Sequence, residues 1–208
     1  MTTPRDLVIV AMDMPSSGPV EHGDLSLALA GAEAVDLLGA GAIRVADGRL
    51  VPVPRPAGPP AGEQPADPLL AAAAAALVQE PPYEPLGDWL WRRGRGLART
   101  YLDAMQENGL LVRENRRRWL VVRNSRLVLV DSAARRRAHH RRRADEPVLA
   151  TLAAAIGVVG GDAAPASDEA TASVLGAVAD AVAELSAERQ RRARRLEDAA
   201  ADNVRRGY

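Results

Sequence analysis

Apolar residues recur at helical spacing over most of the chain, after a short apolar segment at residues 7–12. The strongest pattern covers residues 25–38, where only Ser26, Glu33 and Asp36 are polar and apolar positions surround nearly the whole helix. A helix that is apolar on almost every side belongs at the centre of a helical protein. We therefore predict a mainly α fold, a compact helical bundle around this buried central helix.

One or two small β-hairpins are predicted in addition to the helices. The Asp-Gly pair within residues 43–51 is a strong turn signal between two β-type runs. In a second hairpin, residues 110–112 pair with residues 119–122 across a polar tip, and residues 127–130 form another short β-type run. The sequence thus adds only a little strand structure to a helical fold.

Capping residues and helix breakers mark the remaining helices. They are predicted to begin at Asp67-Pro68, at Asp88, at Asp131-Ser132, at Pro147 and at Asp168. The helix from Asp88 runs to Asn108, and Gly94 and Gly96 weaken its first two turns.

The chain has 208 residues, 47% of them hydrophobic, which suits one domain with a real core. We predict that residues 1–160 form a helical domain, in which the proline-rich residues 52–66 are a mobile loop. Residues 161–208 are predicted as a C-terminal helix and charged tail that packs on the same domain. The longest uncharged apolar runs fall short of the roughly 18 residues that span a bilayer, so we expect a soluble or at most peripheral protein.

Positive charge is concentrated between Arg92 and Arg143. This stretch holds 16 of the 27 basic residues and only four acidic residues, in a chain whose net charge is zero. The surplus of twelve predicts a basic face, and such faces bind the phosphates of nucleic acid or of a membrane surface. Arg92, Arg95 and Arg99 fall within about 60° of each other on the helix predicted from Asp88.

Three groups of binding residues are predicted in this stretch. The lipid headgroup-binding residues are Arg92, Arg95, Arg99, Arg116, Arg117 and Arg118. Trp119 and Arg113 are expected to contact the membrane, with the indole at headgroup depth or, alternatively, packed across the strands. A long-range basic patch comprises Arg135, Arg136, Arg137, Arg141, Arg142 and Arg143. Basic residues near an anionic bilayer contribute on the order of 1 kcal/mol each, which suffices for reversible docking.

Enzyme chemistry has little support in the sequence. The chain has no lysine and no cysteine, which excludes Schiff-base and thiol mechanisms. His139 and His140 are adjacent and lie among arginines that repel a metal cation, so we expect them on a solvated face. We therefore expect a non-enzymatic protein with no catalytic residue, no metal and no cofactor.

Three functions stay open on these residues. The first is a cytoplasmic protein that associates peripherally with anionic lipid on the inner face of the membrane. The second, less favoured, is nucleic-acid binding, because residues 97–122 also fit the recognition helix and wing of a winged helix. The third is a protein-interaction adaptor whose arginines are merely solvated.

The order and spacing of several segments carry a family resemblance. They are residues 25–43, Asp67-Pro-Leu-Leu70, Trp89-Leu-Trp-Arg92, Glu107-Asn-Gly-Leu-Leu111, the basic hairpin, the arginine helix and residues 146–156. In this order they resemble the Golgi phosphoprotein 3 family, over roughly residues 6–160, and the chain is identified as a bacterial member.

The resemblance implies a mostly helical fold around a buried central helix, with a β-hairpin that touches a membrane. Eukaryotic members bind phosphatidylinositol 4-phosphate through one tryptophan and three arginines. The corresponding positions here are Glu21, Ala30, Arg95 and Ala98, so one arginine matches, with Arg92 and Arg99 as nearby substitutes. A generic anionic-lipid surface is therefore expected. Eukaryotic members also bind cytoplasmic tails of glycosyltransferases, which implies tails of membrane proteins as further partners.

Overall fold

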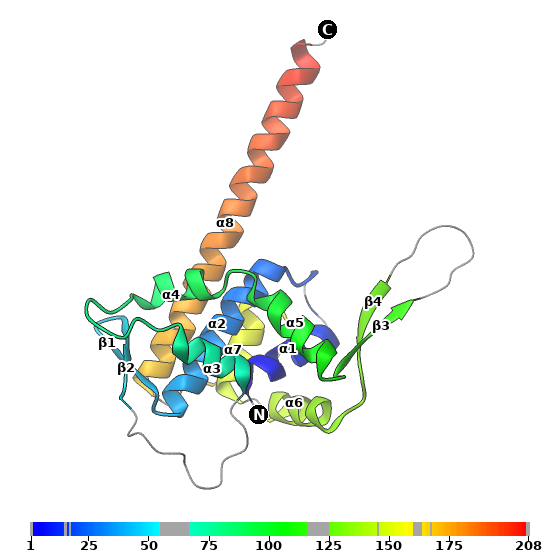
Figure 1. The fold of residues 1–208 in the computed structure, drawn as a ribbon. Coiled ribbons are helices and arrows are strands. Elements are labelled where there is room, and N and C mark those ends of the chain that lie inside the picture. Colours follow the sequence, from blue (N-terminus) through cyan, green and yellow to red (C-terminus); the bar gives the residue numbers. More distant parts are fainter. Residues whose placement is uncertain are drawn as a thin grey trace.

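A computed structural model describes residues 2–14, 16, 18–54, 67–115, 125–144, 146–159, 164–166 and 168–206. The described residues form eight helices and two antiparallel two-stranded sheets, which confirms the mainly α fold with small hairpins (Figure 1). The helices are α1 (Thr3–Asp13), α2 (His22–Gly39), α3 (Pro68–Ala75), α4 (Leu86–Arg93), α5 (Leu97–Glu107), α6 (Ala133–Arg143), α7 (Pro147–Ala155) and α8 (Glu169–Arg206). The strands are β1 (Ile43–Ala46), β2 (Arg49–Pro52), β3 (Leu111–Asn115) and β4 (Ser125–Leu129).

The central helix of the prediction is α2. It packs against α1, α3, α4, α5, α7 and α8, and its residues from Asp24 to Ala34 are all buried. The short apolar segment at residues 7–12 lies within α1, another core helix, in which Leu7 and Val10 are fully buried. These two helices supply much of the apolar core, because residues 7–12 of α1 are all apolar and residues 25–38 of α2 are nearly so.

Each of the three polar side chains within residues 25–38 of α2 has a partner inside the protein. Ser26 Oγ accepts a hydrogen bond from the backbone N–H of Ala98 at 3.0 Å, near the start of α5. Asp36 accepts one from the backbone N–H of Thr3 at 2.8 Å, at the start of α1. Since the first N–H groups of a helix have no partner within it, α2 caps both neighbouring helices. Glu33 belongs to the ion pair described below.

The first predicted hairpin is confirmed. Strands β1 and β2 pair antiparallel, and both turn residues have positive φ, 49° at Asp47 and 69° at Gly48. This conformation is typical of the tight turn that an Asp-Gly pair favours.

The second predicted hairpin has a different partner strand. β3 pairs with β4, in a register that places Leu111 opposite Leu129. Both leucines are buried, at 2% and 7% exposure, so the apolar run at residues 127–130 supplies the strand because it reaches the core. The strand predicted at residues 119–122 lies outside the described residues.

The helix predicted over residues 88–108 is two helices, α4 and α5. Gly94 packs directly on α2, where a Cβ would lie 3.2 Å from the carbonyl oxygen of Ser26. Gly96 has a φ of 74°, a left-handed conformation that glycine adopts readily. The chain changes direction there, between the end of α4 and the start of α5. The two glycines that weaken the predicted helix therefore break it, and they separate the arginines before the break from those after it.

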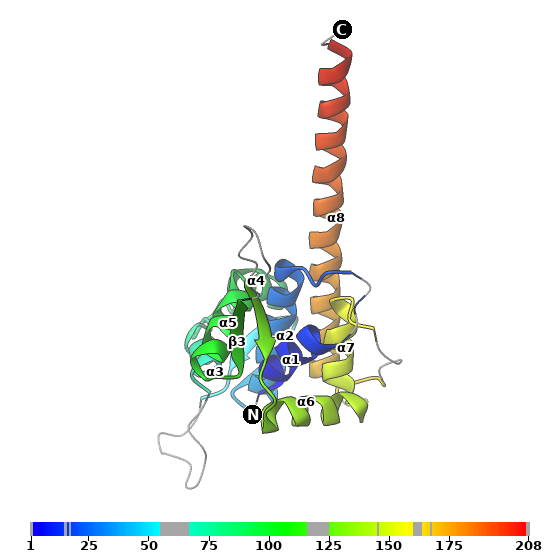
Figure 2. The ribbon, with the colours of Figure 1, turned by 90° about the vertical axis from the view of Figure 1, so that its right-hand side faces the viewer.

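The last helix, α8, extends well beyond the body of the protein (Figure 1). Its first half packs against α2, α4 and α7, and Val174 and Val178 are fully buried there. A Cβ at Gly31 of α2 would collide with Val178, so this glycine allows the two helices to approach closely. α8 is long and apolar enough to span a membrane, but its apolar face is part of the core. The predicted charged tail continues the same helix, and Figure 2 shows it standing clear of the body.

Candidate functional site

Arg92, at the exposed end of α4, is held by neighbouring elements. Its guanidinium donates to both carboxylate oxygens of Glu84, at 2.7 and 2.6 Å, and to the carbonyl oxygen of Ala76 at 2.9 Å. The hydrogen bonds that Arg92 donates to Glu84 raise the pKa of Arg92. With 46% of its side chain exposed, Arg92 is accessible, but its charge is largely compensated. It therefore contributes less to an anion-binding face than an unpaired arginine does.

Arg93, which the sequence did not single out, points into the core. It donates to both oxygens of Glu33, at 2.7 and 2.8 Å, and to the carbonyl oxygen of Leu69 at 3.2 Å. The Tyr101 hydroxyl donates to the same carboxylate at 3.0 Å. Glu33 is fully buried, and this burial raises its pKa although Arg93 and Tyr101 oppose the shift. Such a pair fixes α2, α4 and α5 relative to one another.

A signal for this pair was present in the sequence. A lone glutamate on an otherwise apolar central helix requires a buried partner, because a buried charge is costly unless it is paired. Spacing along the chain does not tell which arginine pairs with Glu33, because the break at Gly94 decides which arginine faces the core.

Arg95, Arg99 and Arg113 are exposed arginines that no carboxylate holds closely in the described structure, and we call these three residues the open basic face. Arg95 and Arg113 make no ion pair with any described residue. Arg99, with 86% of its side chain exposed, lies 3.7 Å from Asp103, a weak surface contact. Exposed apolar residues accompany them along the chain, Trp91 on α4 and Val112 on β3, at 37% and 45% exposure.

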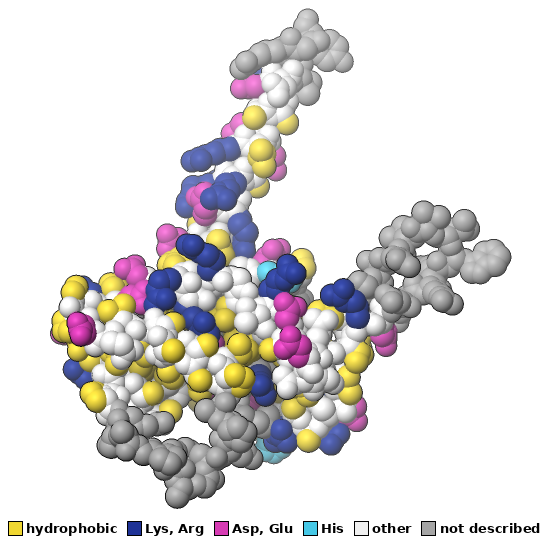
Figure 3. All heavy atoms as spheres, viewed as in Figure 1, with side chains coloured by type: hydrophobic (Ala, Val, Ile, Leu, Met, Phe, Trp, Pro, Cys, Tyr) yellow, Lys and Arg dark blue, Asp and Glu magenta, His cyan; other side chains and the backbone are white. Residues whose placement is uncertain are grey.

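The open basic face spans α5, the turn before it and β3. In Figure 1 and Figure 2 the β3–β4 hairpin and α8 both rise on the side of the body that carries α4. Figure 3 shows basic side chains over α4, α5 and the base of the hairpin, with acidic ones among them. The predicted residues of the hairpin tip, Arg116, Arg117, Arg118 and Trp119, lie outside the described residues.

The predicted long-range patch on α6 is in large part an internal contact surface. α6 packs on α1, where Arg135 and His139 both bond to Asp13, at 2.8 Å each. Arg141 donates to Asp6 of α1 at 2.7 Å and to Glu146 at 3.0 Å. The expectation that His139 lies on a solvated face is thus wrong, because its ring sits against an α1 carboxylate.

The rest of the patch is mixed. Arg142 is buried, at 6% exposure. Arg136 is exposed and lies 3.0 Å from Asp131, while Arg137 and Arg143 are exposed. The six arginines of α6 therefore present less free charge to solvent than their number predicts, because α1 supplies acids to the inward side of the helix.

The pKa values of the two α1 carboxylates that bind α6, Asp13 and Asp6, are shifted in opposite directions. Burial acts to raise the pKa of Asp13, but the hydrogen bonds that Arg135 and His139 make to its carboxylate lower this pKa below its ordinary value. At the deeper Asp6, burial raises the pKa even though Arg141 hydrogen-bonds to it. The contrast follows from depth, since desolvation penalises the charged form more strongly at the fully buried position.

The positions expected for a phosphoinositide pocket give little support to one. Ala30 and Ala98 are buried, at 0% and 1% exposure, and Glu21 precedes α2 as an exposed acid. Arg95 is the one matching residue and it is exposed. Of the four positions, Arg95 is therefore the one that offers a cationic side chain, and it lies on the surface.

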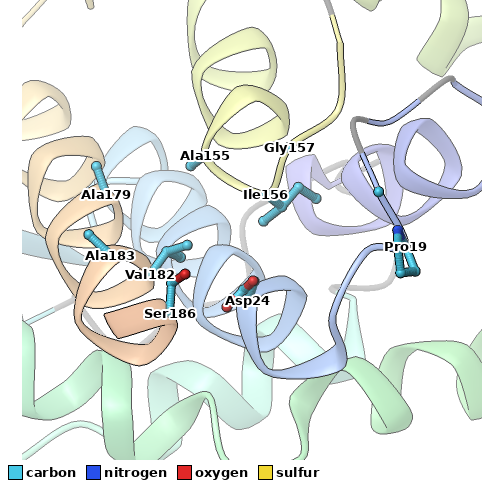
Figure 4. A pocket seen from close by; sticks show the side chains of 10 residues that line it. Pro19, Asp24, Ala155, Ile156, Gly157, Ala179, Val182, Ala183 and Ser186 are labelled. Atoms are coloured by element: carbon cyan, nitrogen blue, oxygen red, sulfur yellow. The ribbon is translucent and has the colours of Figure 1, made fainter. Parts of the chain in front are cut away.

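A hollow of about 400 Å³ lies between α2, α7 and the base of α8 (Figure 4). Small and apolar side chains such as Ala155, Ile156 and Val182 line most of it. Of the described residues that line it, Asp24 alone is charged, and both of its oxygens accept hydrogen bonds from Arg189, at 2.9 and 2.7 Å. The charged group among these lining residues is therefore held by an arginine, and Ser186 supplies a second polar side chain to the hollow.

The fold and its basic face define a mainly helical protein with a charged hairpin edge. A family model described as Golgi phosphoprotein 3 (GPP34) matches residues 4–206, nearly the whole chain. The chain therefore belongs to the Golgi phosphoprotein 3 family. The match runs past residue 160 and includes α8. Comparison with curated proteins found no match.

Proposed function

We propose that this protein is a non-enzymatic peripheral membrane protein that binds anionic lipid headgroups, phosphoinositides included, through the open basic face and the adjoining hairpin. The observation that carries the proposal is the pairing state of the arginines. Arg95 and Arg113 are exposed and make no ion pair with any described residue, whereas Arg92, Arg93, Arg135 and Arg141 are all bound to carboxylates. Unpaired arginines remain available to phosphate.

The surroundings of these arginines favour a membrane over a free anion. Trp91 and Val112 add exposed apolar surface to the region, and an indole suits the boundary between headgroups and acyl chains. Residues 116–119 follow β3 directly along the chain, so three further arginines and Trp119 are tethered to this edge. At about 1 kcal/mol for each basic residue near an anionic bilayer, such a set supports reversible docking.

Under this proposal the protein works on the cytoplasmic side of a membrane, at its inner face, where anionic lipids gather. No lipid chemistry is performed. The protein is held at the membrane surface, and we propose tails of membrane proteins as further partners there.

Co-sedimentation with vesicles tests the proposal. Neutral vesicles of phosphatidylcholine are compared with vesicles that contain phosphatidylserine or phosphatidylinositol 4-phosphate, matched in total charge. We expect binding to both anionic types at low salt and none to the neutral type. Replacing Arg95, Arg99 and Arg113 together by Gln is expected to abolish most of the binding to anionic vesicles. The same loss is expected when Arg116, Arg117 and Arg118 are replaced together by Gln.

The matched control is Arg44→Gln, because Arg44 is an exposed arginine on β1, in the other hairpin. It should leave vesicle binding unchanged. Absence of binding to anionic vesicles at low salt would contradict the proposal, and so would an equal loss in the control. A parallel titration with duplex DNA separates the alternative: tighter DNA binding with a steep salt dependence would assign the face to nucleic acid.

A further inference from the structure

A second hollow, of about 570 Å³, lies beside the β1–β2 hairpin, and we call it the hairpin pocket. Small-molecule sites in proteins commonly have volumes of about 300–1,000 Å³ and combine apolar walls with a few polar groups. The hairpin pocket has both properties, and it lies outside the open basic face. Its described lining residues are Arg44, Val51, Pro52, Val53, Pro54, Gln79 and Tyr83.

The register of the hairpin brings a cation and an apolar floor to one face. Arg44 and Val51 are directly opposite each other on β1 and β2, so their side chains lie on the same face of the sheet. Val53 follows Val51 by two positions, and its N–H donates to the carbonyl oxygen of Ala42 at 2.9 Å, so it continues the pairing and shares that face. Val51 is buried, whereas Val53 is 38% exposed and still offers apolar surface to a ligand.

A second wall of the hairpin pocket comes from the segment between α3 and α4, which carries Gln79 and Tyr83. This segment is bonded to the hairpin. The N–H of Leu50 donates to the carbonyl oxygen of Glu84 at 3.0 Å, and the Arg49 guanidinium donates to the carbonyl oxygen of Tyr83. The two walls are therefore fixed relative to each other before a ligand arrives, which lowers the cost of ordering the site on binding.

Arg44 is the one charged residue of the described lining. It is exposed and forms no ion pair or hydrogen bond with any described residue. Nor does a described residue make a hydrogen bond to the hydroxyl of Tyr83, the half-buried phenol of the second wall. The pocket thus presents an uncompensated guanidinium and an unpaired hydroxyl beside apolar side chains, which is the arrangement that an anionic group with an apolar body requires.

We propose that the hairpin pocket binds a small organic acid, a monocarboxylate with an apolar body, whose carboxylate pairs with Arg44. A guanidinium presents a planar fork of donors that matches a carboxylate bidentately. The hydroxyl of Tyr83 and the amide of Gln79 are further donors for the carboxylate oxygens. The apolar body lies over Val51 and Val53, where it is removed from water.

The single cation selects a singly charged ligand. A phosphate monoester carries about 1.5–2 negative charges near neutral pH, so one guanidinium would leave part of that charge unpaired beside apolar walls. A monocarboxylate needs one cation only. A bilayer is excluded as the occupant by shape, because the lining residues surround a hollow of small-molecule size.

The hairpin pocket and the open basic face lie in different parts of the body. Figure 1 shows the β1–β2 hairpin at one end of the body and the β3–β4 hairpin, which carries Arg113, at the other. The inference therefore does not rest on membrane docking. Variants of one region serve as controls for the other.

Calorimetric titration of the full chain with hexanoate, hexanamide and acetate tests this inference. Hexanoate has both a carboxylate and an apolar body, whereas hexanamide lacks the charge and acetate lacks the body. We expect hexanoate to bind, and each of the other two to bind at least about tenfold more weakly. Absence of hexanoate binding up to millimolar concentrations would overturn the inference, and so would equal binding of hexanamide.

Substitutions in the lining identify the groups that hold the acid. Arg44→Gln should weaken hexanoate binding at least about tenfold, and Tyr83→Phe about threefold, because each removes a donor to the carboxylate. Both changes are away from the core, so the fold should be kept. The matched control is Arg113→Gln, which removes an exposed arginine from the other hairpin and should leave hexanoate binding unchanged. Unaltered binding by Arg44→Gln, or an equal loss in the control, would refute the assignment.

Backbone amide chemical shifts locate the ligand directly. Hexanoate should shift the amide signals of Val51, Val53 and Gln79 and leave those of β3 unchanged. Shifts confined to α5 and β3 would place the acid on the open basic face and overturn the proposed site. A short apolar peptide with a free carboxyl terminus carries the same chemistry. Binding of that peptide more than about tenfold tighter than hexanoate would assign the pocket to a chain terminus and contradict a small acid as its ligand.

Discussion

The arginines of α6 and those of the open basic face come from one basic stretch, yet their surroundings differ. On α6, Arg135 and Arg141 meet carboxylates of α1, so their charge is used inside the protein. Around α5 and β3, Arg95 and Arg113 are exposed and form no ion pair with a described acid. A charge surplus along the sequence therefore does not measure a binding surface. What counts is which cations the fold leaves unpaired.

The buried ion pair between Arg93 and Glu33 provides the strongest test of this comparison. Glu33→Ala should lower the free energy of unfolding by about 3–5 kcal/mol, because it leaves the Arg93 guanidinium in the core without its partner. Urea denaturation measures the loss. Glu33→Gln keeps the size of the side chain and some hydrogen bonds, so a smaller loss is expected. A loss below about 1 kcal/mol for Glu33→Ala would show that Arg93 is not an internal cation.

The next effect concerns the contact between α6 and α1. Arg141→Met should cost about 2–3 kcal/mol near neutral pH, because Asp6 stays buried without its cation. Arg143→Met, on the exposed side of the same helix, should change stability by less than about 0.5 kcal/mol. Equal losses for the two variants would contradict the assignment of Arg141 to the interior.

The cost of Arg141→Met should also depend on pH. Burial raises the pKa of Asp6 above its ordinary value of 3.8, so the folded state holds this proton more firmly than the unfolded state. Stability linked to Asp6 is thus complete below pH 3.8 and is lost as pH rises through the folded pKa. The difference between wild type and variant should therefore shrink on acidification. If the difference in stability between wild type and Arg141→Met grows on acidification instead, ionised Asp6 is not the group that depends on Arg141.

Single neutralisations compare the two regions in membrane binding. Arg113→Gln should weaken binding to anionic vesicles about fivefold, from the roughly 1 kcal/mol that one basic residue contributes near a charged bilayer. Arg135→Gln should leave vesicle binding unchanged while lowering stability, because its guanidinium is engaged by Asp13. If Arg135→Gln weakens vesicle binding as much as Arg113→Gln does, the distinction between the two regions fails.

The smallest expected effect is at Asp103. Its contact with Arg99 is exposed and long, at 3.7 Å, so Asp103→Asn should change the free energy of unfolding by less than about 0.5 kcal/mol. Vesicle binding should stay the same or rise slightly, since Arg99 loses its nearby acid. A clear fall in vesicle binding would mean that Asp103 positions Arg99 for the lipid.

Several elements followed from the sequence because their signals are local. Asp47 and Gly48 form the predicted turn, and Asp67 caps α3 by accepting a hydrogen bond from the backbone N–H of Leu69 at 3.0 Å. Ser132 caps α6 in the same way through Arg135. A cap or a tight turn depends on residues within a few positions of one another, so a single sequence is sufficient to predict it.

The second hairpin and the basic helix depended on distant contacts. The partner strand of β3 was set by Leu129 reaching the core opposite Leu111, not by the nearest apolar run. The single helix predicted over residues 88–108 failed at Gly94, because that residue packs on the backbone of α2. Gly94 and Gly96 already weakened the predicted helix, but the partner that each segment meets, α2 for Gly94 and Leu111 for Leu129, lies outside the segment itself.

By itself, the sequence determined the helical class, the central apolar helix, the caps and the amount of positive charge, all of which depend on composition and short-range spacing. Only the tertiary structure decided which arginines are paired. The acids that neutralise Arg93, Arg135 and Arg141 lie at Glu33, Asp13 and Asp6, between 60 and 135 positions away along the chain. Ion pairs form through space at a few ångströms, so the packing of helices assigns each arginine either to the core or to the surface.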